Sequence, residues 1–306
     1  MRCALMLAMC LVAAVPVVVE AGPPVAQATA PTPDTFTCPM HCEGSKHYEA
    51  PRSCPVCGMA LSLVAGARYA VTVTPLAGPI RPGEPTTLGF TITDPKGKPV
   101  RKLEVVHEKI LHLLVTSADL SWFAHEHPER NAQGDLELRM TFPAPGRYTL
   151  FHDFTPPRVG MQVVPVELTV EGTPPPSVPL VVDERDPKTV DGITARLTST
   201  RPLVAEQNLD LVVSLARGDT PVTDLEPFLG AMGHLIIVSA DGEHFVHSHP
   251  VEHRHRPAPR GPAIGFQCRF PVGGIYKAWA QFQHAGRVLT VPFTIQIAAR
   301  DTAPQH

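Results

Sequence analysis

The segment His112-Leu-Leu-Val-Thr-Ser-Ala-Asp119 recurs further along the chain as His234-Leu-Ile-Ile-Val-Ser-Ala-Asp241. A second stretch, Phe123-Ala-His125-Glu-His127-Pro128, recurs at the same spacing as Phe245-Val-His247-Ser-His249-Pro250. A repetition that keeps both stretches in register indicates two copies of one structural unit. The architecture of one copy therefore decides the fold of most of the chain.

Short runs of alternating apolar and polar residues occur throughout both copies. Examples are Tyr69-Ala-Val-Thr-Val-Thr74 and Leu209-Asp-Leu-Val-Val-Ser-Leu215, and Gly, Pro or Asp lies close to the ends of such runs. Strands of this length and spacing are typical of a β-sandwich. We expect a mostly β protein in which a small Cys-rich metal knuckle precedes two tandem immunoglobulin-like β-sandwiches. The predicted sandwiches are residues 66–172 and 178–299, joined by a Pro-rich linker at 173–177 and followed by a tail at 300–306.

The composition agrees with a β-rich binding protein. The chain has 306 residues, and its 35 prolines and 22 glycines argue against a helical protein. A net charge of −3 gives no electrostatic footprint for nucleic acid, so no nucleic-acid partner is expected. The sequence has no Gly-rich phosphate loop and no Ser-centred nucleophile elbow, and we expect the protein not to be an enzyme.

The N-terminus has the pattern of a secretory signal. Arg2 precedes an apolar run from Cys3 to Val19, and Ala26-Gln27-Ala28 fits the small-x-small pattern of a cleavage site. We therefore predict a signal peptide at 1–28, a linker at 29–34, and an exported protein that is periplasmic or secreted. The alternative is a membrane anchor, and membrane contact is expected only if this segment is retained.

A cysteine cluster follows the linker. It reads Cys38-Pro-Met-His41-Cys42 and then Cys54-Pro-Val-Cys57-Gly-Met59. Two pairs of close ligands separated by about a dozen residues are typical of a small metal knuckle. A segment of about thirty residues cannot bury a stabilising core, so a metal ion or disulfides must organise it. Metal is the favoured interpretation, and a pair of disulfides is the alternative.

The same residues resemble the heavy-metal-binding domain, whose pattern is Cys-Pro-Met-His-Pro followed by Cys-Pro-x-Cys-Gly-Met. That module occurs in periplasmic subunits of copper and silver efflux systems and in some metal-pumping ATPases. The resemblance implies a module at residues 35–64 with Cys38, His41, Cys54 and Cys57 as ligands. Cys42 stands where the family usually has proline, so Cys42 either replaces His41 as a ligand or is a spare thiol. Thiolates with an imidazole suit copper or zinc, and the sequence does not choose between these two ions.

Paired histidines suggest further metal sites in the two sandwiches. His125 and His127 are two residues apart, so both imidazoles project to one face of a strand, and His112 opens the strand before them. We hypothesise one site formed by this trio and a copy formed by His234, His247 and His249. Such binding is expected to weaken as pH falls through about 6.5, since imidazole binds metal in its neutral form. The alternative is that these histidines are structural.

These features predict a cell-envelope protein that captures, buffers or delivers copper or zinc, with the Cys module moving freely on its linker. The metal ion is the expected partner, and a metal-efflux or metal-delivery complex is a further one. The alternative function is a docking protein of an efflux complex whose knuckle is a structural zinc clip. A metalloenzyme that uses the histidines is a third reading.

Overall fold

The computed structural model describes residues 34–39, 43–44, 46–56, 60–66, 68–183, 186–250 and 261–300. These residues belong to one compact unit, which runs from Thr32 to His306. The predicted signal peptide, most of the linker at 29–34 and the tail beyond residue 300 lie outside the described residues.

Every regular element in the described ranges is a β-strand, which confirms the prediction of a mostly β protein. Within that part of the chain, no helix has the length and hydrophobicity needed to cross a membrane.

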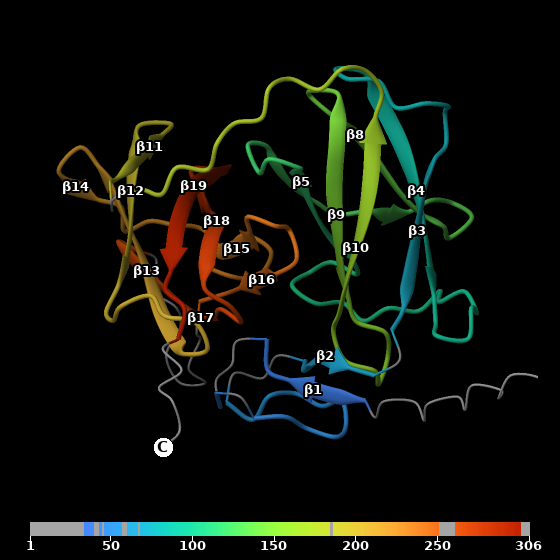
Figure 1. The fold of residues 1–306 in the computed structure, drawn as a ribbon, viewed down its shortest axis with the longest axis horizontal. Coiled ribbons are helices and arrows are strands. Elements are labelled where there is room, and N and C mark those ends of the chain that lie inside the picture. Colours follow the sequence, from blue (N-terminus) through green and yellow to red (C-terminus); the bar gives the residue numbers. More distant parts are fainter. Residues whose placement is uncertain are drawn as a thin grey trace, which may run out of the picture. The chain divides into compact units, whose positions relative to one another are not determined.

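The first repeat is a sandwich of two antiparallel sheets (Figure 1). One sheet has the strand order β10-β9-β5-β6 and the other has the order β3-β4-β8-β7. Alternate residues such as Leu88, Phe90 and Ile92 point into the core between them, because successive side chains of a strand face opposite ways. The strands are β3 (Ala70–Pro75), β4 (Pro85–Thr93), β5 (His112–Ser117), β6 (Phe123–Glu126), β7 (Glu129–Arg130), β8 (Leu136–Thr141), β9 (Gly146–Phe154) and β10 (Gln162–Val170).

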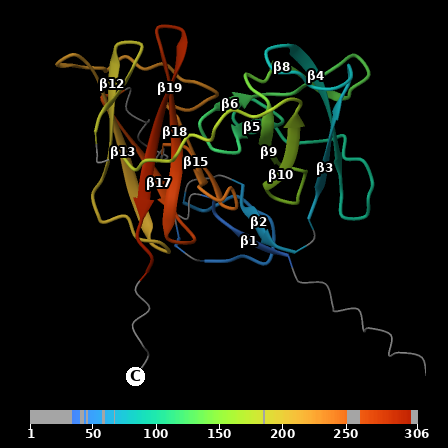
Figure 2. The ribbon, with the colours of Figure 1, turned by 45° about the horizontal axis from the view of Figure 1, so that its top comes forward.

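The second repeat is built in the same way. One sheet has the order β11-β12-β13-β14, with β17 also paired to β13, and the other has the order β16-β15-β18-β19. Figure 2 shows β12 and β13 in one layer and β18 and β19 in the other. The strands are β11 (Lys188–Val190), β12 (Ile193–Ser199), β13 (Asn208–Arg217), β14 (Thr220–Pro221), β15 (His234–Ser239), β16 (Phe245–Ser248), β17 (Ala263–Arg269), β18 (Gly274–His284) and β19 (Arg287–Ile297).

A tyrosine at the same position of each repeat ties a corner of its sandwich. The Tyr148 hydroxyl donates a hydrogen bond of 2.8 Å to the carbonyl of Ala144, and Tyr276 donates one of 2.9 Å to Val272. A tyrosine that bonds back to the main chain a few residues upstream is typical of immunoglobulin-like sandwiches. The two repeats therefore share this local detail as well as their strand order.

The Cys module is a small sheet of β1 (Thr35–Thr37) and β2 (Ser62–Ala65) that is tied to the first sandwich. The Leu63 amide donates to the Met161 carbonyl at 3.0 Å, and the Met161 amide donates to the Leu61 carbonyl at 2.8 Å. Gly160 lies so close that an added Cβ would stand 2.5 Å from the Leu61 carbonyl oxygen. The expectation that the module moves freely on its linker is therefore wrong, because main-chain hydrogen bonds hold it.

The two sandwiches share a separate apolar cluster. Leu114 and Phe151 of the first repeat pack with Ile236 and Trp279 of the second. This contact explains why β5 and β15 are buried along nearly their whole length rather than at every second residue. One face of each strand covers the core of its own sandwich, and the other face lies against the neighbouring repeat. Strands buried on both faces have continuous apolar sequences, as these two do.

Candidate metal centres

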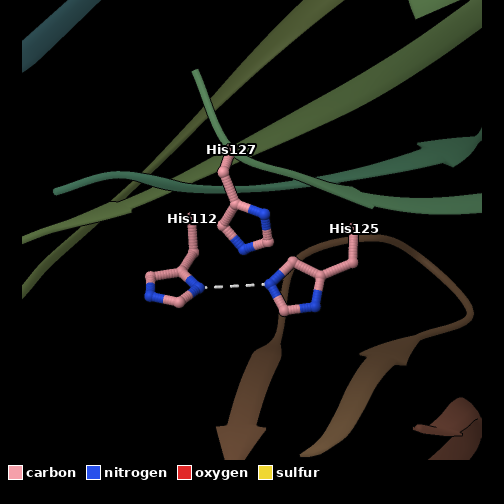
Figure 3. A group of neighbouring side chains, drawn as sticks. All are labelled: His112, His125 and His127. Carbon is pink, nitrogen blue, oxygen red and sulfur yellow. Dashed lines mark hydrogen bonds between the residues drawn. The ribbon is translucent and has the colours of Figure 1, made fainter. Parts of the chain in front are cut away.

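The first histidine trio comes together at one end of the sheet that contains β5 and β6. His112 is the first residue of β5, and His125 lies in β6 opposite Leu114. His127 follows the end of β6, two residues after His125, so its ring lies on the same side as that of His125. One ring nitrogen of each histidine lies within 4.8 Å of those of the other two, and the rings converge in Figure 3.

The second trio repeats this arrangement. His234 opens β15, His247 lies in β16 opposite Ile236, and His249 follows the end of β16. Ring nitrogens of these three residues also lie within 4.8 Å of one another. All three residues are buried, whereas His125 and His127 of the first trio are half-buried. The structure thus brings together both of the trios that the sequence predicts.

Hydrogen bonds to main-chain carbonyls fix the tautomer of the first histidine in each trio. His112 Nε2 lies 2.9 Å from the carbonyl oxygen of Val106, and His234 Nε2 lies 2.8 Å from that of Phe228. A carbonyl only accepts, so Nε2 carries the proton and Nδ1 keeps a free lone pair. The Nδ1 atoms of His112 and His234 are therefore available as metal ligands.

Two tight turns supply these carbonyls. Val106 and Lys109 exchange hydrogen bonds across His107 and Glu108, whose φ angles are 46° and 66°. The equivalent turn from Phe228 to Ala231 also has two positive φ angles at its centre. Positive φ at both central residues is the conformation of a type I′ turn. The same turn therefore aims a carbonyl at the first histidine of each trio.

The second histidine of each trio has its tautomer fixed by a side chain. His125 Nδ1 lies 2.7 Å from Gln281 Oε1, and His247 Nδ1 lies 3.1 Å from Asp153 Oδ2. These oxygens accept, so Nδ1 carries the proton and Nε2 keeps its lone pair. The pattern, in which the non-binding nitrogen donates to a carbonyl or carboxylate, is the usual one for metal-binding histidines.

As a result, two lone pairs face each other in each trio. His112 Nδ1 and His125 Nε2 are 3.2 Å apart, and His234 Nδ1 and His247 Nε2 are 3.4 Å apart. Two unprotonated nitrogens at such distances repel, because neither supplies a hydrogen. A cation between them replaces that repulsion with attraction. The chemistry of the donor set therefore fits a metal ion.

The third histidine of each trio carries buried nitrogens without a hydrogen-bond partner. These are Nε2 of His127 and both ring nitrogens of His249. A buried polar atom that makes no hydrogen bond costs about 1–3 kcal/mol, so native proteins keep few of them. Their position beside two free lone pairs completes a three-nitrogen site in each repeat.

Burial keeps these imidazoles neutral. It lowers the pKa of His127 to about 3 and those of His125, His234, His247 and His249 well below the ordinary value of 6.5. Neighbouring histidines add a smaller effect in the same direction, because two positive charges so close together repel. The neutral form, which binds metal, therefore persists to a lower pH than the expected value of about 6.5.

The structure describes two of the five candidate ligands in the Cys module. Cys38 and Cys54 are 2% and 1% exposed and lie in one apolar cluster with Phe36 and Leu61. A bridge between Ser53 and Ala60 closes the turn that follows Cys54. His41, Cys42 and Cys57 lie outside the described residues.

Three residues near the trios are absent from the sites predicted from the sequence. The His107 ring stacks on that of His249 at a centroid distance of 3.9 Å. Asp153 and Gln281 occupy equivalent positions of β9 and β18, opposite His112 and His234 respectively. The sequence signal for Asp153 and Gln281 is a polar residue at the equivalent position of a buried stretch in each strand.

Comparison with known proteins gives a family for most of the chain. Residues 64–172 and 188–299 match a domain of unknown function (DUF8832), and residues 35–62 match the heavy metal binding domain. The latter supports a metal-binding role and the predicted resemblance of the Cys segment. No curated protein matches the chain.

Several solved structures match much of this chain. The Escherichia coli adhesin FdeC is 14% identical over 78% of this chain and 68% of its own, with a TM-score of 0.24. The fibronectin(III)-like modules of Clostridium thermocellum CbhA are 12% identical over 78% of this chain and 98% of theirs, with a TM-score of 0.22. Likeness at these TM-scores gives no ground for assigning a function. The match to the repeated domain covers more than half of the 306 residues, and the chain therefore belongs to the DUF8832 family.

Proposed function

We propose that this chain is an exported protein of the cell envelope that captures, buffers or delivers a heavy-metal ion, either copper or zinc. The observation that carries the proposal is the match of residues 35–62 to the heavy metal binding domain. Two cysteines of that segment, Cys38 and Cys54, are buried in one cluster, which agrees with a shared ion. Thiolate and imidazole ligands together suit copper and zinc.

The histidine trios give a second class of site for the same ions. They favour a binding protein over the alternative of a docking protein with a structural zinc knuckle. Docking surfaces do not need buried imidazole nitrogens that lack partners, and each such nitrogen lowers stability. His249 carries two of them.

A cavity supports delivery between the two classes of site. It has a volume of 300 Å³ and is lined by Pro39, which follows Cys38, and by His247 of the second trio. Met161 and Phe245 form part of its apolar wall. In this proposal, an ion released by the thiolates moves along this space, which is open to solvent, toward His247.

The test is metal analysis of the full-length chain isolated from the cell envelope after growth with added copper or zinc. Replacing Cys54 with Ser is expected to remove about one ion per chain, because a thiolate in the turn is lost. Cys268→Ser is the matched control, since Cys268 is an equally buried thiol in the core of the second sandwich. Burial raises the pKa of the Cys268 thiol to about 12, so it forms no thiolate at neutral pH.

Equal metal content in the Cys54→Ser variant and the unchanged protein contradicts a metal site in the Cys module. A chain that is recovered from the cytoplasm rather than the envelope contradicts export. If the knuckle holds zinc tightly but neither copper nor zinc exchanges from any site, the docking function replaces the one proposed.

A further inference from the structure

We propose that the two histidine trios are halves of a single two-ion centre that spans the sandwiches, and that each half is oriented by a side chain of the opposite sandwich. The inference rests on the proposed metal-binding function and extends it from the Cys module to a second site of defined composition.

The two trios lie close together. Ring centroids of His125 and His247, which belong to different trios, are 5.6 Å apart, and those of His125 and His234 are 5.8 Å apart. Within one trio, the corresponding distance between His112 and His125 is 5.5 Å. Rings of different trios are thus nearly as close as rings of one trio, whose centroids lie 4.5–5.6 Å apart. Because a metal ion lies about 2 Å from its imidazole nitrogen, ions in the two halves are neighbours.

The hydrogen bonds that support the second histidine of each trio cross between the repeats. Asp153 lies in β9 of the first sandwich, beside His112, yet its carboxylate bonds to His247 of the second. Gln281 lies in β18 of the second sandwich, beside His234, yet its amide bonds to His125 of the first. Partners of this kind orient the metal-binding histidine and raise its basicity. Each trio therefore depends on one hydrogen-bond partner from the other repeat.

A rigid aromatic contact holds the two halves together. Phe123 stacks on Trp279 with centroids 4.6 Å apart, and Phe245 stacks on Phe151 at 4.9 Å. Aromatic pairs of this geometry contribute about 0.5–1.5 kcal/mol each beyond the area they bury. They fix the trios relative to each other before any ion binds, so the centre is preorganised.

The crossing also makes the two halves unequal. The half with His234, His247 and His249 is supported by the carboxylate of Asp153, whereas the other half is supported by the neutral amide of Gln281. A carboxylate raises the basicity of its histidine more than an amide does, because it accepts the proton with a negative charge. We therefore expect the second-repeat half to fill first and to hold its ion more tightly.

The experiment titrates the full-length chain with Co(II). Charge-transfer absorption of thiolate-bound Co(II) reports the Cys module, and d–d bands that grow without further charge-transfer absorption report sites made of imidazole. We expect two imidazole-bound Co(II) ions per chain whose electron paramagnetic resonance spectrum shows a magnetic interaction between neighbours. Two imidazole-bound ions without such an interaction overturn the single centre.

The hydrogen bonds between repeats are tested by a substitution in one repeat and a measurement of the Co(II) affinity of the trio in the other. Asp153→Asn is expected to weaken the half that contains His247 by roughly 10- to 100-fold. In a His249→Leu background, where that half is already broken, Asp153→Asn is expected to have no further effect. Asp210→Asn is the matched control, because it makes the same chemical change in β13 of the second sandwich. Weakening of the His125 half alone, or independent effects of Asp153→Asn and His249→Leu, overturns the crossing.

A reciprocal variant covers the case in which Asp153→Asn does not fold, which circular dichroism detects. Gln281→Glu places a carboxylate behind His125 and is expected to tighten the first half by about 10-fold or more. An unchanged affinity of that half overturns the proposal. If the full-length chain binds no Co(II) through imidazole but still shows thiolate absorption, the two-ion centre is overturned and the proposed function stands. If both signals are absent, both are overturned.

Discussion

Replacing His249 with Leu is expected to change stability in opposite directions with and without metal. His249 is 5% exposed, and neither of its ring nitrogens has a hydrogen-bond partner. Leaving a buried polar group unsatisfied costs about 1–3 kcal/mol. The leucine removes this cost but also removes the stacking of His249 on His107, which contributes about 0.5–1.5 kcal/mol. The metal-free variant is therefore expected to be more stable than the unchanged protein by about 1 kcal/mol.

Metal reverses the order because the variant has lost a ligand. An ion present at about 1,000 times its dissociation constant stabilises the folded chain by about 4 kcal/mol, and the variant gains little of this at the altered site. The assay is urea unfolding of the full-length chain, once in chelator and once in excess Zn(II). His244→Leu is the control, since His244 is a half-buried histidine close to β16 but outside the trio.

Two results together refute this reasoning. In chelator, the His249→Leu variant is less stable than the unchanged protein by more than about 1 kcal/mol. In excess Zn(II), the same variant is stabilised as much as the unchanged protein. His249 is then a structural histidine whose ring fills the core, and its lack of partners has no functional meaning.

Further predictions concern the Cys module, the buried His152 of the first sandwich and the hydrogen bond of Tyr148. Gly160→Ala forces a Cβ to within 2.5 Å of the Leu61 carbonyl at a φ of 85°, so it is expected to free the module for limited proteolysis while the sandwiches keep their thermal stability. Burial lowers the pKa of His152 to about 4, so its stabilising effect is present above pH 6.5 and is lost as pH falls toward 4. Between pH 6.5 and 4, the metal-free His152→Leu variant is therefore expected to lose less free energy of unfolding in urea than the unchanged protein, by up to about 3 kcal/mol. An equal loss in both proteins contradicts the assignment. Tyr148→Phe removes the hydrogen bond to Ala144 and is expected to cost about 1 kcal/mol in urea unfolding, with no change in bound metal.

The trios could be predicted from the sequence because the repeat itself supplies the constraint. A strand, a short turn and a His-x-His pair recur without gaps, so the antiparallel pairing that joins Leu114 to His125 also joins Ile236 to His247. Local pairing is enough to bring the histidines of one repeat together. Nothing about the contact between repeats is needed for that prediction.

The crossing partners could not be predicted in this way. Asp153 and Gln281 meet their histidines only because one sandwich packs on the other. The bonded residues are 94 and 156 positions apart in the sequence. The available signal was indirect: β5 and β15 contain the unbroken apolar runs Leu113–Val115 and Leu235–Val238, whereas a strand with one solvated face would alternate apolar and polar residues. The free movement expected of the Cys module failed for a similar reason, since the hydrogen bonds between its second strand and Met161 follow no sequence pattern.

The reciprocal contacts between the sandwiches are those of an isologous interface, in which every contact appears twice with the partners exchanged. Phe123 meets Trp279 as Phe245 meets Phe151, and the two crossing hydrogen bonds obey the same rule. In a homodimer of a single-repeat ancestor, symmetry would require the residues at the crossing positions to be identical. Tandem fusion removes this requirement, so one position can carry a carboxylate and the other an amide. The fused chain thus keeps the geometry of a two-fold dimer while its two proposed ion sites are free to differ in strength, which identical subunits in a symmetric dimer cannot achieve.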